Sequence, residues 1–329
     1  MTAAPVLAPT LVVPRNGDSS VLTVETREVP APGPGEITVR VAAAGVNFID
    51  VYQRQGVYPL ATPFVLGSEG AGTVERVGKG AAQSPGDRVA WGQHRGSAAG
   101  LVTLPASAVV TVPVGLELDI AAAAMLQGLT AHYLVNSTYA VQPGDTVLAH
   151  AVAGGVGQLL VQLVKAKGAT LIGTAGTDEK AAKATALGAD HVINYTEVDD
   201  LGAAVRELTG GTGAHVVYDG VGTSTFDASL AALRPRGTLV LFGAASGQVP
   251  PFDIQRLNAG GSLFLTRPTL ANYIATRDEL EWRATEILGA LADGDLTLEV
   301  GGRYPLTEAA AAYNALEGRR TTGKLLLIP

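Results

Sequence analysis

Three closely spaced glycines, Gly154, Gly155 and Gly157, form the pattern in this 329-residue sequence that points most directly to a chemistry. They follow a short apolar run, residues 146–151, and precede apolar residues at helical spacing. This pattern predicts a strand, a glycine turn and a helix. A turn without Cβ atoms lets the backbone approach a pyrophosphate, and the helix N-terminus offers free N–H groups to its charge. We therefore expect a dinucleotide site, with Val152 in place of the first glycine of G-x-G-x-x-G. A glycine turn without a ligand is the alternative.

The end of the next predicted strand indicates which dinucleotide is bound. NAD sites usually carry an acidic side chain there, about 20 residues beyond the glycines, that binds the ribose 2′-OH. Here the strand, residues 170–174, is followed by Gly176, Thr177 and Lys180, and Tyr195 follows the third strand. These groups can contact a 2′-phosphate, so we predict NADPH. A solvated helix charge is the alternative role for Lys180, and two neighbouring carboxylates weaken the prediction.

The elements that position these residues alternate between strand and helix from residue 146 onward. Strands are expected at residues 146–151, 170–174, 191–194, 215–218, 238–242 and 262–265. Regular alternation predicts a doubly wound parallel Rossmann sheet. Residues 1–125 instead show short strand patterns between Pro/Gly turns, which is typical of a barrel-like β domain. We expect an α/β fold in which a Rossmann domain, residues 127–267, is inserted into a β-rich domain, residues 1–126 and 268–329.

The composition narrows the class of protein. With 47% apolar and 16% charged residues, the chain can bury a large interior. It contains no cysteine, which removes disulfides and thiolate ligands and is compatible with a reducing cytosol. A net charge of −7 and a pI near 5.3 argue against a nucleic-acid partner. Residues 1–17 lack signal-peptide features and no run of about 18 apolar residues is present, so we expect a cytoplasmic protein without a membrane span.

Segments spread over nearly the whole chain match one protein family in order. They are GVNFIDVYQRQGVYP, GSEGAGTVERVG, PGD before AVAGGVGQLLVQLVK, INY, VVYDGVG, LVLFGAASG, LFLTRP and GKLLLIP. On these segments the chain resembles the medium-chain dehydrogenase/reductases, and specifically the zinc-independent quinone oxidoreductases related to zeta-crystallin. The resemblance implies a Rossmann domain inserted into a GroES-like β-rich domain. Val152 departs from the family, which usually has Ala or Ser there, and we expect it to crowd the turn slightly.

The resemblance also implies a site without metal. The catalytic ligands of the superfamily's zinc alcohol dehydrogenases are two cysteines and a histidine, whose positions here hold Asn47, Ser68 and Gln127. None of these is a first-choice zinc ligand, and the cysteine-rich structural zinc loop is absent. Oxidation of an alcohol through a metal-bound alkoxide is therefore not expected. A quinone is the expected hydride acceptor, because its reduced form is stabilised without a metal.

Two polar clusters of the β-rich domain supply candidate catalytic residues: Asn47, Asp50 and Tyr52 in GVNFIDVY, and Ser68 with Glu69 in GSEG. We expect the first three, together with Gln127, near the nicotinamide and the quinone in a cleft between the domains. Asn47 and Tyr52 are expected to donate hydrogen bonds to the developing oxyanion. Alternatively, Asn47 satisfies buried backbone groups and Tyr52 is only part of the wall.

Further cofactor contacts and the assembly are implied by the resemblance. Besides the glycine turn and the 2′-phosphate group, the cofactor is expected to contact Thr130, Val156, Gly220, Phe242, Gly243, Thr266, Arg267 and Arg319. The apolar segment GSLFLTRP at the edge of the sheet is expected to pair with its copy in a homodimer. His150 is expected to be a hydrogen-bonded structural residue rather than an acid or base.

Two other functions stay open. A reductase of activated C=C bonds, acting on a 2-alkenal or an enoyl thioester, needs a similar site. A protein that binds NADPH without turnover, as an RNA-binding or crystallin-like protein, is the alternative from another class. The acidic net charge disfavours RNA binding.

Overall fold

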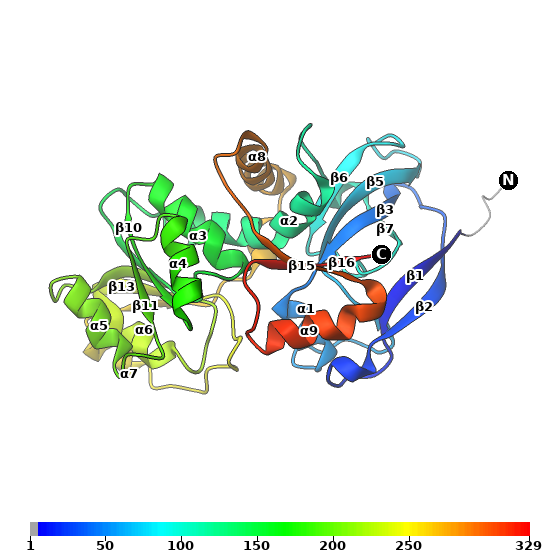
Figure 1. Cartoon of the computed structure of the whole chain (residues 1–329). Coiled ribbons are helices and arrows are strands. Elements are labelled where there is room, and N and C mark those ends of the chain that lie inside the picture. The colour runs from blue at the N-terminus through cyan, green and yellow to red at the C-terminus, as the bar shows by residue number, and fades with distance from the viewer. Residues whose placement is uncertain (1–5) are drawn as a thin grey trace. The chain divides into compact units, whose positions relative to one another are not determined.

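The computed structural model describes residues 6–329, which divide into two compact units (Figure 1). The first unit combines the chain up to Leu129 with Thr276–Pro329, and the second is Thr130–Ala275. Residues 1–5, the start of the segment without signal-peptide features, lie outside the described residues.

The second unit is built on a parallel sheet of six strands. These strands are β9 (Thr146–Ala149), β10 (Thr170–Ala175), β11 (His191–Asn194), β12 (Ala214–Asp219), β13 (Leu233–Leu241) and β14 (Phe264–Thr266), in the order β11-β10-β9-β12-β13-β14. The helices are α3 (Gly155–Ala166), α4 (Asp178–Ala186), α5 (Leu201–Leu208), α6 (Phe226–Ala232) and α7 (Gln255–Ala259), with a 3-10 turn, η4, at Leu270–Tyr273. Strand, helix and sheet order confirm the predicted Rossmann fold.

The strand order places the site of this unit. From β9 the chain moves outward through β10 to β11, and it then returns to β12 on the other side of β9. Right-handed crossovers therefore place α3 and α4 on one face and α5 to α7 on the other. Where the direction reverses, between β9 and β12, the loops at the C-terminal strand ends separate and leave room for a ligand.

The first unit is β-rich and contains two sheets. Its strands are β1 (Val6–Val13), β2 (Thr23–Val29), β3 (Glu36–Gly45), β4 (Phe64–Val65), β5 (Glu69–Val77), β6 (Arg88–Gly92), β7 (Leu101–Pro105), β8 (Val110–Thr111), β15 (Val300–Pro305) and β16 (Lys324–Ile328). One sheet has the order β15-β16-β3-β5-β6-β8, with β7 also paired to β3, and the other has the order β2-β1-β4. The helices are α1 (Phe48–Arg54), α2 (Leu118–Tyr133), α8 (Arg277–Asp293) and α9 (Ala309–Glu317), and the 3-10 turns are η1 (Ser19–Val21), η2 (Ala106–Ala108) and η5 (Leu306–Glu308). This architecture confirms the predicted β-rich domain.

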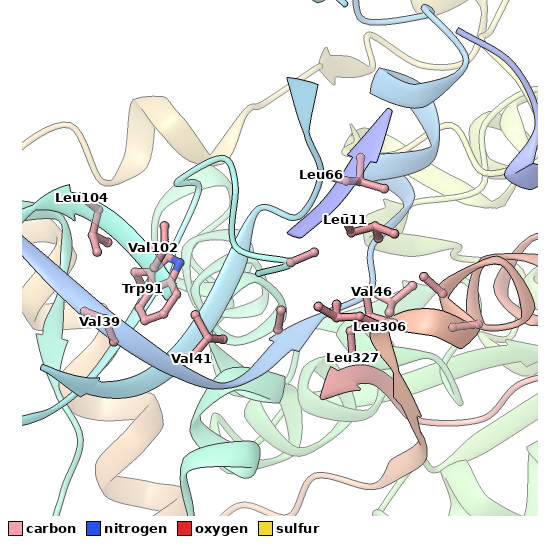
Figure 2. Packing of buried hydrophobic residues seen from close by; sticks show 14 of the residues in the cluster. Leu11, Val39, Val41, Val46, Leu66, Trp91, Val102, Leu104, Leu306 and Leu327 are labelled. Carbon is pink, nitrogen blue, oxygen red and sulfur yellow. The ribbon is translucent and has the colours of Figure 1, made fainter. Parts of the chain in front are cut away.

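Apolar side chains from both sheets form the core of the first unit (Figure 2). Val39 and Val41 alternate along β3 and pack with Trp91 of β6 and Leu104 of β7. Trp91 is fully buried, and its indole N–H donates to Ser97 Oγ at 2.8 Å. The polar end of the largest core side chain is therefore satisfied inside the core.

Helix α2 continues into a π-helical turn, η3 (Leu134–Thr138), and together they form an unusually apolar segment. By length and composition, Leu118–Thr138 could cross a membrane, but 78% of its apolar window is buried in the structure. The buried core helix of a globular domain can have the same length and apolar composition as a membrane span. The sequence does not predict a membrane span here, because Asp119, Gln127 and His132 interrupt the apolar run.

Candidate active site

The glycine turn of the second unit has the expected geometry. Gly154 is the N-cap of α3, which begins at Gly155. A side chain at Gly157 would clash with the Ala151 carbonyl, so glycine allows the first turn of α3 to approach the loop after β9 closely. The Gly154 N–H donates to the Ala151 carbonyl at 2.9 Å, and the start of α3 at Gly155 is where the pyrophosphate is predicted to bind.

Val152 does not crowd this turn, in contrast to the expectation. Its side chain is fully buried and lies over Gly173 of β10. A Cβ atom at Gly173 would lie 2.7 Å from Val152 Cγ2, so the missing side chain on β10 provides the space that the valine fills. The extra volume of Val152 is therefore directed into the sheet and away from the ligand side of the turn.

The residues predicted to contact a 2′-phosphate lie together at the end of β10. Tyr195 is 43% exposed, and its hydroxyl would lie 2.5 Å from a Cβ atom at Gly176. Thr177 caps α4, and its Oγ1 accepts a hydrogen bond from the Lys180 N–H at 3.3 Å. Asp178, one of the two carboxylates that weakened the prediction, accepts from Asn194 Nδ2 at 2.9 Å.

The expected contacts on β12 and β13 also lie side by side. A Cβ atom at Gly220 would lie 2.8 Å from Phe242 Cζ, and a side chain at Gly243 would clash with the Gly220 carbonyl. Arg267, which follows β14, donates from Nη1 to the Leu241 carbonyl at 3.0 Å. Its guanidinium is therefore partly engaged with the end of β13.

The remaining expected cofactor residues are placed separately. Val156 lies in the first turn of α3, Thr130 is buried in α2 and Thr266 ends β14. Arg319 belongs to the first unit, where it follows α9 with a φ of 54° and is exposed. Within the second unit, the expected residues on the loops after β10, β12 and β13 lie at the strand ends, and the contact of Arg319 with the cofactor stays a prediction.

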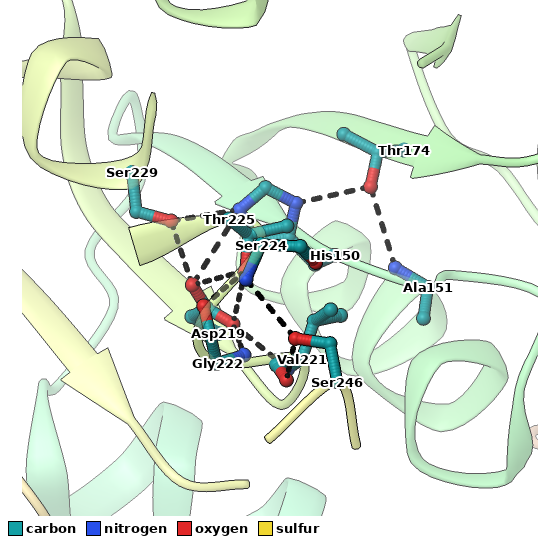
Figure 3. A network of polar contacts seen from close by, with 10 residues as sticks. All are labelled: His150, Ala151, Thr174, Asp219, Val221, Gly222, Ser224, Thr225, Ser229 and Ser246. Atoms are coloured by element: carbon teal, nitrogen blue, oxygen red, sulfur yellow. Dashed lines mark hydrogen bonds and ion pairs between the residues drawn. The ribbon is translucent and has the colours of Figure 1, made fainter. Parts of the chain in front are cut away.

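A buried polar network, which the sequence did not predict, supports these strand ends (Figure 3). At its centre is Asp219, the last residue of β12. Its carboxylate accepts from the Val221 N–H at 2.8 Å and the Gly222 N–H at 2.9 Å. It also accepts from Thr225 Oγ1 at 2.7 Å and from Ser229 Oγ at 2.8 Å. Asp219 thereby fixes the loop that carries Gly220.

His150 extends this network to the glycine turn (Figure 3). Its Nδ1 lies 3.0 Å from Thr174 Oγ1 and its Nε2 lies 2.9 Å from Ser229 Oγ. Because Ser229 donates its only proton to Asp219, it must accept from His150, which places the imidazole proton on Nε2. Burial lowers the pKa of His150, in agreement with this neutral form. The hydrogen bonds confirm the expected structural role of this histidine.

In the first unit, a buried ion pair lies beneath the predicted catalytic cluster. Glu69 is fully buried, and its Oε1 accepts from Lys324 Nζ and, at 2.8 Å, from Asn47 Nδ2. Its Oε2 accepts from the Leu126 N–H of α2 at 2.6 Å. Gly45 makes room for this carboxylate, since a side chain there would collide with it. Lys324, at the start of the terminal strand, was not among the predicted site residues.

Asn47 is held on every side by this pair. Its Nδ2 donates to Glu69 and to the Gly45 carbonyl at 3.3 Å, and its Oδ1 accepts from Lys324 Nζ at 2.7 Å and Gln127 Nε2 at 2.5 Å. Both amide protons are therefore engaged. In this arrangement Asn47 Nδ2 is committed to Glu69 and Gly45, which favours the alternative in which Asn47 satisfies buried groups.

Asp50 is also a supporting residue rather than one exposed to a substrate. It is fully buried and accepts from the Asn47 N–H at 3.0 Å, Ser68 Oγ at 2.8 Å and Tyr313 Oη at 3.1 Å. Burial raises the pKa of Asp50 to about 6, although these hydrogen bonds and the charge of Lys324 oppose the shift. The carboxylate therefore joins α1 to the residue before β5 and to α9, and both of its oxygens are engaged within the protein.

Tyr52 is the predicted catalytic residue with the most accessible position. It is half-buried on α1, and its ring packs edge-on to Tyr58 with the ring centroids 5.3 Å apart. The centroid of the Phe48 ring lies 6.2 Å from that of Tyr52. These contacts restrict the Tyr52 ring, and its contact with a substrate stays a prediction.

Comparison with known proteins gives the family. Residues 33–114 match the model of the alcohol dehydrogenase GroES-like domain, and residues 155–285 match that of the zinc-binding dehydrogenases. The chain is 44% identical to a quinone oxidoreductase of Pseudomonas aeruginosa, over 95% of this chain and 97% of the relative. The chain belongs to the quinone oxidoreductases of the medium-chain dehydrogenase/reductase superfamily.

Two other members of the superfamily bear on the site. The solved structure of Escherichia coli quinone oxidoreductase complexed with NADPH shares 41% identity and a TM-score of 0.95, covering 98% of this chain and all of that one. A 2-haloacrylate reductase of a Burkholderia species is 41% identical, over 97% of this chain and 98% of the relative. Reductases of both quinones and activated alkenes are therefore similar to this quinone oxidoreductase.

The positions that hold zinc in other members of the superfamily do not suit a metal in this quinone oxidoreductase. Asn47 and Gln127 are bonded to each other, and Ser68 donates to Asp50. The Lys324 ammonium already provides the cation beside Glu69. Within residues 6–329, no group of three or more His, Asp or Glu side chains is arranged to hold a metal ion.

Proposed function

We propose that this protein is an NADPH-dependent quinone oxidoreductase that reduces its acceptor without a metal. The observation that carries the proposal is the end of β10. It lacks a carboxylate for a free 2′-OH and presents Gly176, Thr177, Lys180 and Tyr195 together. The similar Escherichia coli quinone oxidoreductase was solved with NADPH.

We assign the cofactor to the domain of residues 127–267. The backbone of Gly154 to Gly157 binds the pyrophosphate, and the group at the end of β10 binds the 2′-phosphate. Gly220, Phe242 and Gly243 support the nicotinamide half, because the Phe242 ring packs against Gly220 and the backbones of Gly220 and Gly243 approach closely after β12 and β13. Thr130, Val156, Thr266, Arg267 and Arg319 are assigned as further contacts.

In the reaction, NADPH supplies a hydride, so that a quinone, NADPH and one proton give a hydroquinone and NADP⁺. Tyr52 donates a hydrogen bond to the quinone oxygen that becomes negative. Asn47 and Asp50 do not contact the acceptor; they hold Gln127 and α1 in place. The proton comes from water or from the Tyr52 hydroxyl.

The test is to measure NADPH and NADH oxidation by the purified protein with an ortho-quinone. We expect oxidation of NADPH to be strongly preferred, and we expect Lys180→Met to raise KM for NADPH about tenfold with little change for NADH. Lys183→Met, on the same helix, is the control. Equal use of both cofactors by the unmodified protein would overturn the assignment of the β10 end.

Reduction of an activated C=C bond is the second candidate, and similarity to the 2-haloacrylate reductase favours it. The same assay with 2-chloroacrylate and with a 2-alkenal separates the two functions. Turnover of an alkene alone would replace the quinone by that substrate. Binding of NADPH without turnover of any acceptor would leave a binding role.

We also propose a cytoplasmic homodimer. The edge strand β14 supports the dimer, since Phe264 on it is 60% exposed and Ile254 nearby in the sequence is 68% exposed. The lack of cysteine supports a reducing compartment. Light scattering of Phe264→Asp tests the dimer, because a charge there should give monomers.

A further inference from the structure

Gln127 carries a buried acceptor atom that nothing in the described chain satisfies. Its side chain is 7% exposed, and its Nε2 donates to Asn47 Oδ1. Its Oε1 has no hydrogen-bond partner among the described residues. Buried carbonyl oxygens without a partner are rare in folded proteins, so this atom needs an explanation.

The orientation of the Gln127 amide follows from the charges beside it. The Lys324 ammonium can only donate, and it has three acceptors: Glu69 Oε1, Asn47 Oδ1 and the Val46 carbonyl. The atom of Asn47 that faces Lys324 must therefore be oxygen. The Glu69 carboxylate can only accept, which places the Asn47 nitrogen on the opposite side.

The orientation of the Asn47 amide in turn fixes that of the Gln127 amide. Because Asn47 presents its oxygen to Gln127, the Gln127 atom that faces it must be the nitrogen. A flipped Gln127 amide would bring two oxygens together. The ion pair of Lys324 and Glu69 thus decides, through Asn47, that the group left for a ligand is a carbonyl oxygen and not an amide N–H.

We propose that Gln127 Oε1 accepts a hydrogen bond from an O–H or N–H group of the bound ligand, and that Lys324 and Glu69 are positioning residues for this contact. The inference rests on the proposed function and on the expectation that Gln127 lies near the nicotinamide and the quinone. One source of the donor is the hydroxyl that reduction creates on the quinone. The other is the carboxamide of the nicotinamide.

The experiment compares two ligands that differ in this donor. Binding of a hydroquinone and of its dimethyl ether to the NADP⁺-loaded protein is measured as inhibition constants or by calorimetry. We expect the unmodified protein to prefer the hydroquinone about tenfold, which is the worth of one hydrogen bond to a buried acceptor. Gln127→Met, similar in shape but without the acceptor, should remove this preference.

A second variant tests the positioning pair without leaving a buried charge unpaired. In Glu69→Gln/Lys324→Met both charges are removed together, and Asn47 can adopt either amide orientation. The preference for the hydroquinone should fall to about twofold. Lys79→Met, an exposed lysine, is the control that should keep the full preference. A merely structural role of the pair would weaken both ligands equally and leave their ratio unchanged.

The outcomes separate the two sources and the two proposals. If Gln127→Met no longer prefers the hydroquinone over its dimethyl ether, the donor is the hydroxyl of the reduced quinone. An unchanged ratio with NADPH affinity about tenfold weaker assigns it to the carboxamide. If quinone turnover is normal but neither quantity changes, the inference is wrong. If the unmodified protein has no quinone turnover, the proposed function is wrong, and the NADPH affinity of Gln127→Met still tests the acceptor.

Discussion

Glu69 in the first unit and Asp219 in the second are both fully buried carboxylates, and they are stabilised in different ways. Glu69 is balanced by the ammonium of Lys324. Asp219 is surrounded by N–H and O–H groups of its own loop and of α6. In a charge pair, most of the stabilisation of the buried carboxylate comes from one partner. Around Asp219, several neutral donors share this stabilisation. Substitutions should therefore have larger effects around Glu69 than around Asp219.

The largest effect is expected for Lys324→Met. This change leaves Glu69 buried and unpaired, so the free energy of unfolding should fall by about 3–5 kcal/mol. Chemical denaturation followed by circular dichroism measures it, with Lys79→Met as the control. Adding Glu69→Gln should recover most of the loss. If Lys324→Met costs less than 1 kcal/mol, the carboxylate does not depend on the ammonium and the contrast between the two sites is wrong.

Asp50 should give the first unit an unusual dependence on pH. Its pKa is about 6 in the folded protein and near 3.8 when unfolded, so the folded state keeps a proton that the unfolded state loses. Stability from this group is full below pH 3.8 and is lost as pH rises through 6, by about 3 kcal/mol in total. Asp50→Asn should remove this slope in denaturation curves between pH 4 and 7. Asp199→Asn, at an exposed site, should leave it unchanged.

A smaller effect is expected for Ser229→Ala. It removes one of several donors to Asp219 and leaves the His150 Nε2–H without an acceptor, at a cost of about 1–3 kcal/mol. Ser224→Ala is the matched control, because its backbone N–H and not its hydroxyl joins the network. A cost equal to that of Lys324→Met would mean that the donors of Asp219 act as a single unit.

His150 should respond to pH in the opposite sense to Asp50. Its pKa is lowered by burial, so below its ordinary value of 6.5 the unfolded state binds a proton that the folded state does not. Stability is therefore lost as pH falls through 6.5. His150→Gln, which can keep both hydrogen bonds, should reduce this loss between pH 7 and 5, and His191→Gln at an exposed site should not. Identical curves for His150→Gln and the unmodified protein would contradict the buried neutral imidazole.

The two units also differ in how much the sequence predicts. In the second unit the strands have their own apolar patterns, and β11 has the predicted bounds. In the first unit, β1 contains Pro9, and α1 is rich in β-branched and aromatic residues, so neither was predicted. Helix α1 depends on Asp50, whose side chain accepts the Asn47 N–H at its start. Asp50 is in turn held by Ser68 and Tyr313, which are distant in the sequence.

The candidate site residues also differ between the two units in how far the sequence predicts them. The glycine turn and the residues around Lys180 are local patterns, and they were predicted as such. Lys324 lies 255 residues from Glu69, and no spacing rule connects them. Asp219 could have been found, because an aspartate followed by two glycines and then hydroxyl residues is typical of a side-chain-capped loop.

The contact between Val152 and Gly173 bears on any attempt to redesign the cofactor turn. The two positions share one volume, with a large residue on the loop and none on the strand. Libraries that randomise only the turn would keep glycine at position 173. They would therefore sample only the side-chain volumes at position 152 that fit against this glycine. Residues 152 and 173 are better exchanged as a pair, so that a bulkier strand residue is always matched by a smaller one in the loop.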